Sequence, residues 1–181
     1  MDVIFDIDGT LADASHRLHF IKDMRYWTQS PSNPEGVPKP DWESFLSDEQ
    51  VSKDAPISQT WALLETMLYD QENFRVIFIT GRNESTREMT LDWLTKQNCP
   101  FRGNSAHRWE YRKRSGGMTG PVVYMRSVGD RRPSDAVKRD LLNKARADGF
   151  NPTLVFEDRK DDTAMWRSEG LLCCQVAEGD Y

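Results

Sequence analysis

The sequence predicts an α/β fold in which helices cover both faces of a mostly parallel sheet. Short apolar runs, which we expect to be strands, alternate along the whole chain with longer amphipathic segments, which we expect to be helices. The apolar runs are continuous, as in strands that are buried on both faces, and do not alternate with polar residues. Together these observations predict three layers, with the sheet in the middle.

Length and composition are those of a folded domain. The 181 residues fit a single domain that spans residues 1–181 and has room for a small inserted cap. Hydrophobic residues make up 38% and charged residues 29% of the chain, and the hydrophobic ones are clustered, so we expect a core. The net charge of −5 argues against a general affinity for nucleic acid, so a polyanion would have to meet a local basic patch.

The apolar runs are too short for a signal peptide or a membrane span. The first run, Val3-Ile4-Phe5, is far shorter than the apolar part of a secretory signal. No run approaches the roughly 20 residues of a transmembrane helix. The cysteines (Cys99, Cys173 and Cys174) are odd in number, and two are adjacent, which suits a disulfide framework poorly. We therefore expect a cytoplasmic protein with reduced thiols and no membrane partner.

In the first half of the chain, one strand precedes a long polar segment. Residues 2–5 predict a buried strand, and residues 14–25 a helical turn or two. Residues 28–41 contain four prolines and predict a loop. Residues 41–54 carry five acids and one lysine, which is typical of a solvated face. Residues 57–70 then predict an amphipathic helix, and we expect residues 12–56 to be an inserted cap.

The second half repeats a strand and helix alternation. Residues 75–79 predict a strand, residues 84–97 a helix, and residues 99–121 an irregular, Gly- and Pro-rich segment. In the helix expected at 134–148, Ser134 is predicted to be the N-cap, with Asp135 in the first turn. The remaining expected elements are strands at 122–125, 153–156 and 171–176 and helices at 134–148 and 160–169.

Polar residues follow the strands where they end. The first strand is followed by Asp6-Ile7-Asp8-Gly9-Thr10, the second by Thr80-Gly81-Arg82, and the fourth by Glu157-Asp158-Arg159. Lys138 lies one turn into the helix after the third strand. Ligands of open α/β sheets bind at the carboxyl ends of the strands, so we expect these groups to converge there.

The chemistry of this edge suggests phosphoryl transfer. Neighbouring carboxylates repel one another unless a cation lies between them, and Mg²⁺ prefers oxygen ligands. One carboxylate can attack phosphorus and form an acyl phosphate, while a second protonates the leaving oxygen and later activates water. Thr80 and Lys138 can hold the phosphoryl oxygens. Gly9 and Gly81 allow the backbone to approach the ligand closely.

These motifs resemble those of the haloacid dehalogenase (HAD) superfamily of phosphatases. Asp6-Ile7-Asp8-Gly9-Thr10-Leu11 is similar to its first motif, and Thr80, Lys138 and Glu157-Asp158 are similar to the other three. The resemblance covers the chain apart from residues 12–56 and roughly 102–120, and it implies a HAD-like Rossmannoid fold.

The resemblance also implies a role for each motif residue. Asp6 would be the nucleophile and a metal ligand, and Asp8 the general acid and base, with its backbone carbonyl on the metal. Thr80 and Lys138 would contact the phosphate. Asp158 would be the further carboxylate ligand of a Mg²⁺ ion, with Glu157 as its outer partner.

A narrower resemblance links the chain to the 3′-phosphatase domains of bacteriophage polynucleotide kinase/phosphatases. It rests on Phe156-Glu157-Asp158-Arg159, Met165-Trp166-Arg167 and the C-terminal run from Gln175 to Tyr181. It implies a substrate-side role for Arg17, Arg82 and Arg126, beside Gly81, and a 3′-phosphorylated DNA or RNA end as substrate in nucleic-acid repair. No GxxxxGK[ST] loop is present, so we expect no kinase activity from this chain.

Other conspicuous residues have simpler explanations. Residues 102–114 hold five basic residues and one acid between aromatic ones, which suits either a nucleic-acid contact or a solvated loop. His16 and His19 follow the first motif but are poor Mg²⁺ ligands, so we expect contacts to substrate or within the cap. We expect the tryptophans, Trp27, Trp42, Trp61, Trp93 and Trp166, to serve in packing. Arg159 is expected either to support Asp158 or to form a surface pair.

Two alternatives compete with the nucleic-acid phosphatase. A free-nucleotide phosphatase would use the same chemistry under a cap that closes over a mononucleotide. A non-catalytic binding protein on the same fold is disfavoured because both aspartates of the first motif are intact. A dehalogenase is also disfavoured, because it would need neither Asp8 nor a metal.

Overall fold

The computed structural model describes residues 1–28, 36–70, 72–97, 110–112, 118–119 and 122–179. Within these residues a five-stranded parallel sheet has the order β7-β4-β1-β8-β9. Its strands are β1 (Asp2–Phe5), β4 (Arg75–Asn83), β7 (Val122–Arg126), β8 (Pro152–Arg159) and β9 (Leu172–Gly179). The parallel sheet that the continuous apolar runs predicted is confirmed.

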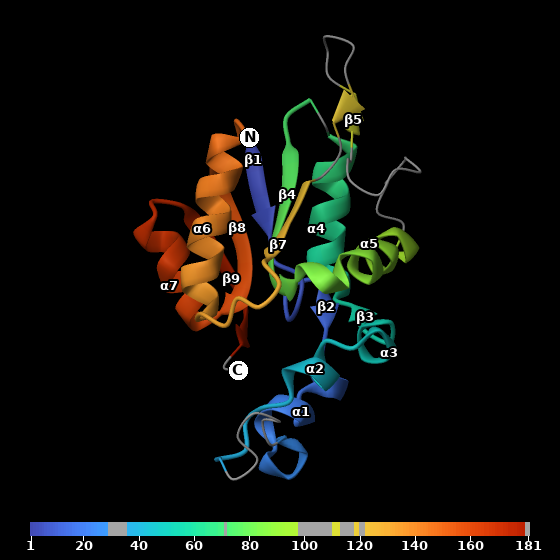
Figure 1. The fold of residues 1–181 in the computed structure, drawn as a ribbon. Coiled ribbons are helices and arrows are strands. Elements are labelled where there is room, and N and C mark those ends of the chain that lie inside the picture. The colour runs from blue at the N-terminus through green and yellow to red at the C-terminus, as the bar shows by residue number, and fades with distance from the viewer. Residues whose placement is uncertain (29–35, 71, 98–109, 113–117, 120–121, 180–181) are drawn as a thin grey trace.

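Two pairs of helices cover the two faces of the sheet (Figure 1). On one face α4 (Ser58–Tyr69) and α5 (Arg87–Lys96), which follows the short helix η3 (Glu84–Thr86), pack through Trp61, Leu64 and Trp93. On the other, α6 (Ser134–Ala147) and α7 (Lys160–Ser168) pack through Leu142 and Trp166.

The central strand β1 contacts both layers because successive side chains of a strand point to opposite faces. Val3 and Phe5 belong to the core beneath α4 and α5, and Ile4 belongs to the core beneath α6 and α7. All three side chains are fully buried. This explains why the β1 sequence is apolar throughout, and it confirms the three-layer fold.

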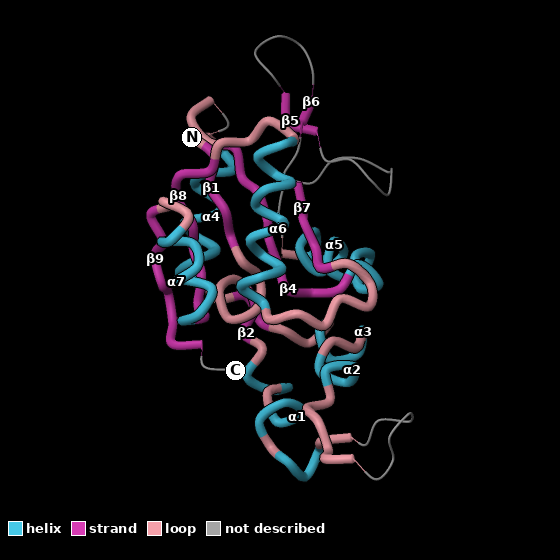
Figure 2. Tube along the Cα trace, turned by 60° about the vertical axis from the view of Figure 1, so that its left-hand side comes forward, coloured by secondary structure: helices cyan, strands magenta, loops and turns pink. Residues whose placement is uncertain are grey.

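We call residues 12–56 the inserted segment, and its described residues lie at the end of the molecule where β1 and β4 finish (Figures 1 and 2). Its two ends pair as an antiparallel ladder of β2 (Ala12–Asp13) and β3 (Ala55–Pro56). Its short helices are η1 (Ser15–Arg17), α1 (His19–Lys22), η2 (Met24–Tyr26), α2 (Trp42–Phe45) and α3 (Asp48–Val51). Ala14, Ile21 and Phe45 form a small separate core within it.

Three local expectations were wrong. Residues 41–54 are not simply a solvated face, because they form α2 and α3 and end in the buried Asp54. Residues 99–121 are not wholly irregular, because the backbones of β5 (Glu110–Arg112) and β6 (Met118–Thr119) pair as an antiparallel ladder. Ser134 is not the N-cap of α6. Pro133 occupies that position, and the Ser134 hydroxyl donates to Asp162 instead.

The tryptophans mostly pack as expected. Trp61, Trp93 and Trp166 are buried, whereas Trp42 is 45% exposed and stacks edge-on against Phe45. Of the helices that the structure describes, none combines the length and the hydropathy that a membrane crossing requires.

We predict that Leu64→Ala lowers the free energy of unfolding by about 2–5 kcal/mol, because it opens a cavity in the core beneath α4. Leu64 is completely buried, whereas its neighbour Leu63 on the same helix is 45% exposed. Urea denaturation of Leu64→Ala should therefore be compared with that of Leu63→Ala, which we expect to change stability by less than about 1 kcal/mol. Equal losses in the two variants would contradict this packing.

Candidate active site

The loop after β1 places two aspartates at the carboxyl edge of the sheet. The amide of Asp6 donates to the Phe156 carbonyl at 3.0 Å, so β1 stays paired with β8 up to that residue. Beyond Ile7 the chain turns sharply, and the amides of Leu11 and Ala12 both donate to the Ile7 carbonyl at 2.8 Å. Gly9 supports this turn with a φ of +77°, which other residues rarely adopt.

The Lys138 side chain lies at the centre of a buried cluster of acids. Its Nζ is 3.1 Å from Asp6 Oδ1, 2.7 Å from Glu157 Oε2 and 2.9 Å from Asp162 Oδ2. Lys138 is 2% exposed, and none of the three acids is more than 4% exposed. An ammonium in this position fixes the Asp6 carboxylate at the edge of the sheet.

Burial and charge shift the pKa values of this cluster in opposite directions. Burial raises the pKa of Asp6 well above its usual range, and the negative charges of Glu157 and Asp158 add to this, while Lys138 opposes it. Burial alone would lower the pKa of Lys138, but Asp6, Glu157 and Asp162 outweigh it and raise the pKa. The lysine is therefore a permanent cation, whereas ionised Asp6 needs further positive charge nearby.

A second cation fits beside these acids. Carboxylate oxygens of Asp6, Glu157 and Asp158 all lie within 4.8 Å of one another, and all three residues are buried. With Asp162 there are four acids, and they outnumber the cations beside them, since Lys138 contacts three of them and Arg159 lies 3.9 Å from Asp162. Negative charge therefore remains in excess. Mg²⁺ prefers carboxylate oxygens, so this donor set suits it.

Glu157 is held by hydrogen bonds from several sides. Its Oε2 accepts from Lys138 Nζ and from Trp166 Nε1 at 3.0 Å. Its Oε1 accepts from the amides of Asp158 and Arg159. These contacts fit the outer role predicted for Glu157, which remains a prediction.

Strand β9 shapes the position of Asp158. Gln175 Nε2 donates to the Asp158 carbonyl at 2.9 Å. A Cβ atom at Gly179 would collide with Asp158 Oδ2, so any side chain there would displace the carboxylate. Gly179 thus leaves the space that Asp158 occupies.

The second motif lies at the end of β4, beside β7. Thr80 is fully buried, and its hydroxyl accepts from the amide of Arg82 at 3.2 Å. The Gly81 carbonyl accepts from Arg126 Nε at 3.0 Å. Arg126 also donates to the carbonyls of Asp130 and Arg132, and these bonds hold the loop before α6 in place. Burial lowers the pKa of the Arg126 guanidinium.

Arg17 and Arg82 lie in a second buried cluster, around Asp8. Arg17 Nη2 is 2.5 Å and Arg82 Nη2 is 2.6 Å from Asp8 Oδ1. Both arginines also bind Asp54, and all four side chains are at most 15% exposed. Burial would raise the pKa of Asp8, but Arg82 and Arg17 outweigh it and hold the pKa well below its usual range.

The structure thus brings the predicted residues together in two groups. Asp6, Lys138, Glu157 and Asp158 form one, and Asp8, Arg17 and Arg82 form the other. Sequence reasoning missed Asp54, Asp162, Trp166 as a hydrogen-bond donor, and Gly179. Asp162 lies in the first turn of α7, directly after the strand that carries Asp158, and this position near the carboxyl edge of the sheet is a signal that could have indicated it.

The remaining candidates lie at the margins of these groups or away from them. His16 Nδ1 is 3.9 Å from Asp54 Oδ1 and its Nε2 is 3.1 Å from the Gln50 carbonyl, whereas His19 stacks against Phe20 and Tyr26. Arg159 lies 3.9 Å from Asp162. Cys173 and Cys174 are free thiols. Cys99 and the side chains of residues 102–114 lie outside the described part of the chain.

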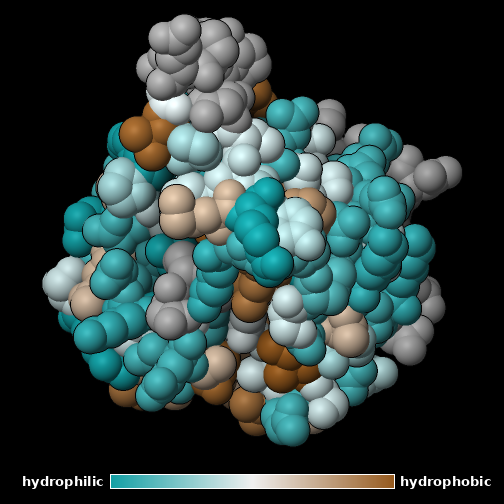
Figure 3. All heavy atoms as spheres, turned by 90° about the horizontal axis from the view of Figure 1, so that it is seen from below, coloured by the Kyte–Doolittle hydropathy of each residue, from teal (hydrophilic) through white to brown (hydrophobic). Residues whose placement is uncertain are grey.

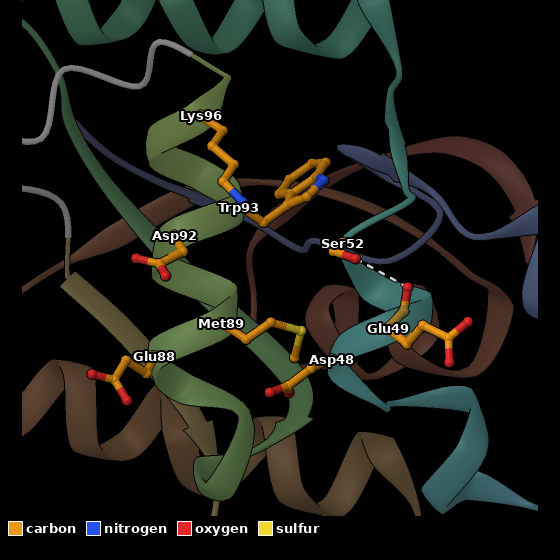
Figure 4. A pocket seen from close by; sticks show the side chains of 8 residues that line it. All are labelled: Asp48, Glu49, Ser52, Glu88, Met89, Asp92, Trp93 and Lys96. Atoms are coloured by element: carbon orange, nitrogen blue, oxygen red, sulfur yellow. Dashed lines mark hydrogen bonds between the residues drawn. The ribbon is translucent and has the colours of Figure 1, made fainter.

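A groove of about 460 Å³ lies between α3 and α5 (Figure 4). Its lining includes Asp48 and Glu49 from α3 and Glu88, Asp92 and Trp93 from α5. Seen from the end where the inserted segment lies, the surface is mainly hydrophilic, with small separate hydrophobic spots (Figure 3).

Comparisons with known proteins agree with this fold. A family model described as the polynucleotide kinase PNKP phosphatase domain matches residues 43–181. The chain therefore belongs to this family, and it is a phosphatase of the HAD superfamily.

Several solved structures share the fold at low sequence identity. A chain of the Pnkp1/Rnl/Hen1 complex is 21% identical with a TM-score of 0.66, and the match covers 99% of this chain and 46% of that one. The HAD-like hydrolase SP0104 from Streptococcus pneumoniae is 16% identical with a TM-score of 0.54, covering 95% and 82%. A class C acid phosphatase from Bacillus anthracis is 11% identical with a TM-score of 0.55, covering 99% and 67%. This chain thus spans less than half the length of the matched chain of the complex.

We predict that Lys138→Met lowers the free energy of unfolding by about 3–5 kcal/mol, because it leaves Asp6, Glu157 and Asp162 buried without their shared cation. Lys144→Met is the matched control, since Lys144 lies on the same helix and is exposed. Thermal and urea denaturation of both variants measure the difference. A Lys138→Met protein as stable as the control would show that the ammonium does not hold the cluster together.

Proposed function

We propose that this chain is a Mg²⁺-dependent phosphomonoesterase that removes a terminal 3′-phosphate from DNA or RNA through an aspartyl phosphate on Asp6. The observation that carries the chemistry is the buried Asp6 carboxylate, held 3.1 Å from Lys138 Nζ beside Glu157 and Asp158. Membership of the PNKP phosphatase family supports the nucleic-acid substrate.

In the first step Asp6 attacks phosphorus, and the bond from phosphorus to the leaving oxygen breaks. Asp8 donates a proton to that oxygen. The second step reverses the proton transfer, as Asp8 takes a proton from water while the water oxygen attacks phosphorus and the bond to Asp6 breaks. Lys138 and Thr80 hold the phosphoryl oxygens as their charge redistributes.

The arginines beside Asp8 favour its carboxylate form, which is the form that the second step needs. A phosphate dianion that arrives beside Asp8 acts in the opposite direction, because a like charge raises the pKa of a carboxylate. Substrate binding would thus supply the protonated form for the first step.

The carboxylates of Asp6 and Asp158 and the backbone carbonyl of Asp8 would hold the Mg²⁺ ion, with Glu157 as an outer partner. The ion would supply positive charge that relieves repulsion between these acids and the incoming phosphate.

We also propose that the inserted segment acts as a cap. It places short helices beyond the end of the sheet where Asp6 lies (Figure 1). This position is the observation that favours a free mononucleotide as the alternative substrate, since a cap can enclose a small ligand.

We expect Asp6→Asn to abolish turnover, because an amide is a far weaker nucleophile than a carboxylate. Asp8→Asn should also lower kcat by about 100-fold or more, since both proton transfers rest on that residue. Phosphate release under saturating substrate measures both, and circular dichroism checks that the variants fold. An Asp6→Asn enzyme with normal turnover would refute the nucleophile assignment.

EDTA should stop phosphate release, and added Mg²⁺ should restore it. Mg²⁺ should also raise the Tm of the resting protein, since an ion that binds only the folded state stabilises it. Asp158→Asn should lose this rise, whereas Asp70→Asn, at the distant end of α4, should keep it. Turnover in EDTA, or a Tm rise that survives Asp158→Asn, would count against the metal site.

The substrate assignment is tested by comparing kcat/KM for a 3′-phosphorylated oligonucleotide, the same oligonucleotide with a 5′-phosphate, and a panel of mononucleotides. We expect the 3′-phosphorylated end to give the highest value. Preference for a mononucleotide would leave the Asp6 chemistry unchanged but favour the alternative substrate. It would also indicate that the inserted segment determines which substrate is accepted.

A further inference from the structure

The second buried cluster joins the inserted segment to the core. Asp54 lies just beyond α3, at the end of the inserted segment, and Arg17 lies in η1 within it. Asp8 and Arg82 come from the core. Two carboxylates and two guanidinium groups thus meet in one buried quartet whose formal charges cancel.

Each arginine uses four of its five N–H donors in hydrogen bonds, three of them to the aspartates of this quartet. Arg17 donates through Nε to Asp54 at 2.8 Å, through Nη1 to the Phe45 carbonyl at 2.8 Å, and through Nη2 to both aspartates. Arg82 donates through Nε and Nη2 to Asp8, through Nη2 to Asp54 and through Nη1 to Thr90. Every nitrogen of both guanidinium groups therefore has a partner, and both side chains have 0% exposure.

Asp54 orients the guanidinium groups of Arg17 and Arg82 by accepting hydrogen bonds from both. Its Oδ1 accepts from Arg17 Nε, and its Oδ2 accepts from Nη2 of both arginines, at 2.7 and 3.1 Å. The Asp54 carbonyl accepts from Trp93 Nε1 at 2.9 Å, which ties Asp54 to α5. Trp93 also lies at the edge of the groove in Figure 4, and its ring centroid is 5.9 Å from the Arg82 guanidinium.

We propose that Asp54 is a positioning residue for the reaction, which holds Arg17 and Arg82 so that they fix the carboxylate of Asp8. This inference rests on the proposed function, because it concerns the proton transfers assigned to Asp8. It gives Arg17 and Arg82 a different role from direct phosphate binding, since four of the five N–H donors of each arginine are already used within the protein. It also makes a residue of the inserted segment part of the catalytic geometry.

The test uses Asp54→Asn, which keeps the size of the side chain but removes its charge and places an NH₂ group among arginine donors. On a 3′-phosphorylated oligonucleotide, whose leaving alkoxide needs a proton, we expect kcat to fall about 10- to 100-fold while KM stays within about twofold. With p-nitrophenyl phosphate the leaving phenolate needs no proton, so the burst rate of nitrophenol release should stay within about threefold of wild type.

Asp2→Asn is the matched control. Asp2 is a buried aspartate that accepts from Arg75 Nε at 2.6 Å and Nη2 at 2.5 Å, at the opposite end of β1. It should lower the Tm without changing either rate. If Asp54→Asn fails to fold, Asp54→Glu keeps the charge while moving the carboxylate by one carbon, and the same dependence on leaving group is expected.

Three results would overturn the inference alone. One is a raised KM with unchanged kcat, which would mean that the arginines bind the substrate. Another is an equal loss on both substrates, and the third is a variant that behaves like Asp2→Asn. A wild-type enzyme that releases no phosphate from any substrate would instead overturn the proposed function, and this inference with it.

Discussion

The ammonium of Lys138, buried among carboxylates at the carboxyl edge of the sheet, is the interaction on which the site depends. Without it, Asp6, Glu157 and Asp162 would be buried negative charges that repel one another, and protonation would remove the nucleophile. With it, Asp6 keeps a fixed position but still lacks enough positive charge around it. The same imbalance that makes the cluster costly as a resting structure makes it suitable for a divalent cation and a phosphate.

A second charged cluster surrounds Asp8 and holds its carboxylate in one orientation. A group that must both donate and accept a proton has to be held in one orientation, and Asp8 lies on a loop beyond the last paired residue of β1. The guanidinium groups of Arg17 and Arg82 supply that restraint, and Asp54 restrains them in turn. Because Arg17 and Asp54 belong to the inserted segment, the arrangement of that segment and the orientation of Asp8 are linked.

The parts of the fold that follow from periodicity were predictable. Continuous apolar runs indicated the parallel strands, and the acids at the carboxyl ends of β1 and β8 indicated the edge where Asp6 and Asp158 meet. The partners of Asp8 were not predictable from pattern, since Asp54 lies in a run of acids that reads as a solvated face. Only the antiparallel pairing of Ala12–Asp13 with Ala55–Pro56 brings that aspartate to the core. The role of Gly179 could not be predicted from the sequence either, because it depends on the space that this residue leaves for Asp158.

Trapping the phosphorylated intermediate would show whether Asp6 becomes phosphorylated during turnover. The enzyme would be mixed with substrate and Mg²⁺, quenched in acid and treated with borohydride, which reduces an aspartyl phosphate to homoserine. Peptide mass spectrometry then locates the modified residue. We expect homoserine at position 6 in the presence of substrate and unmodified Asp6 without it. Modification at Asp8 or Asp158, or active turnover with no modified aspartate, would contradict this expectation.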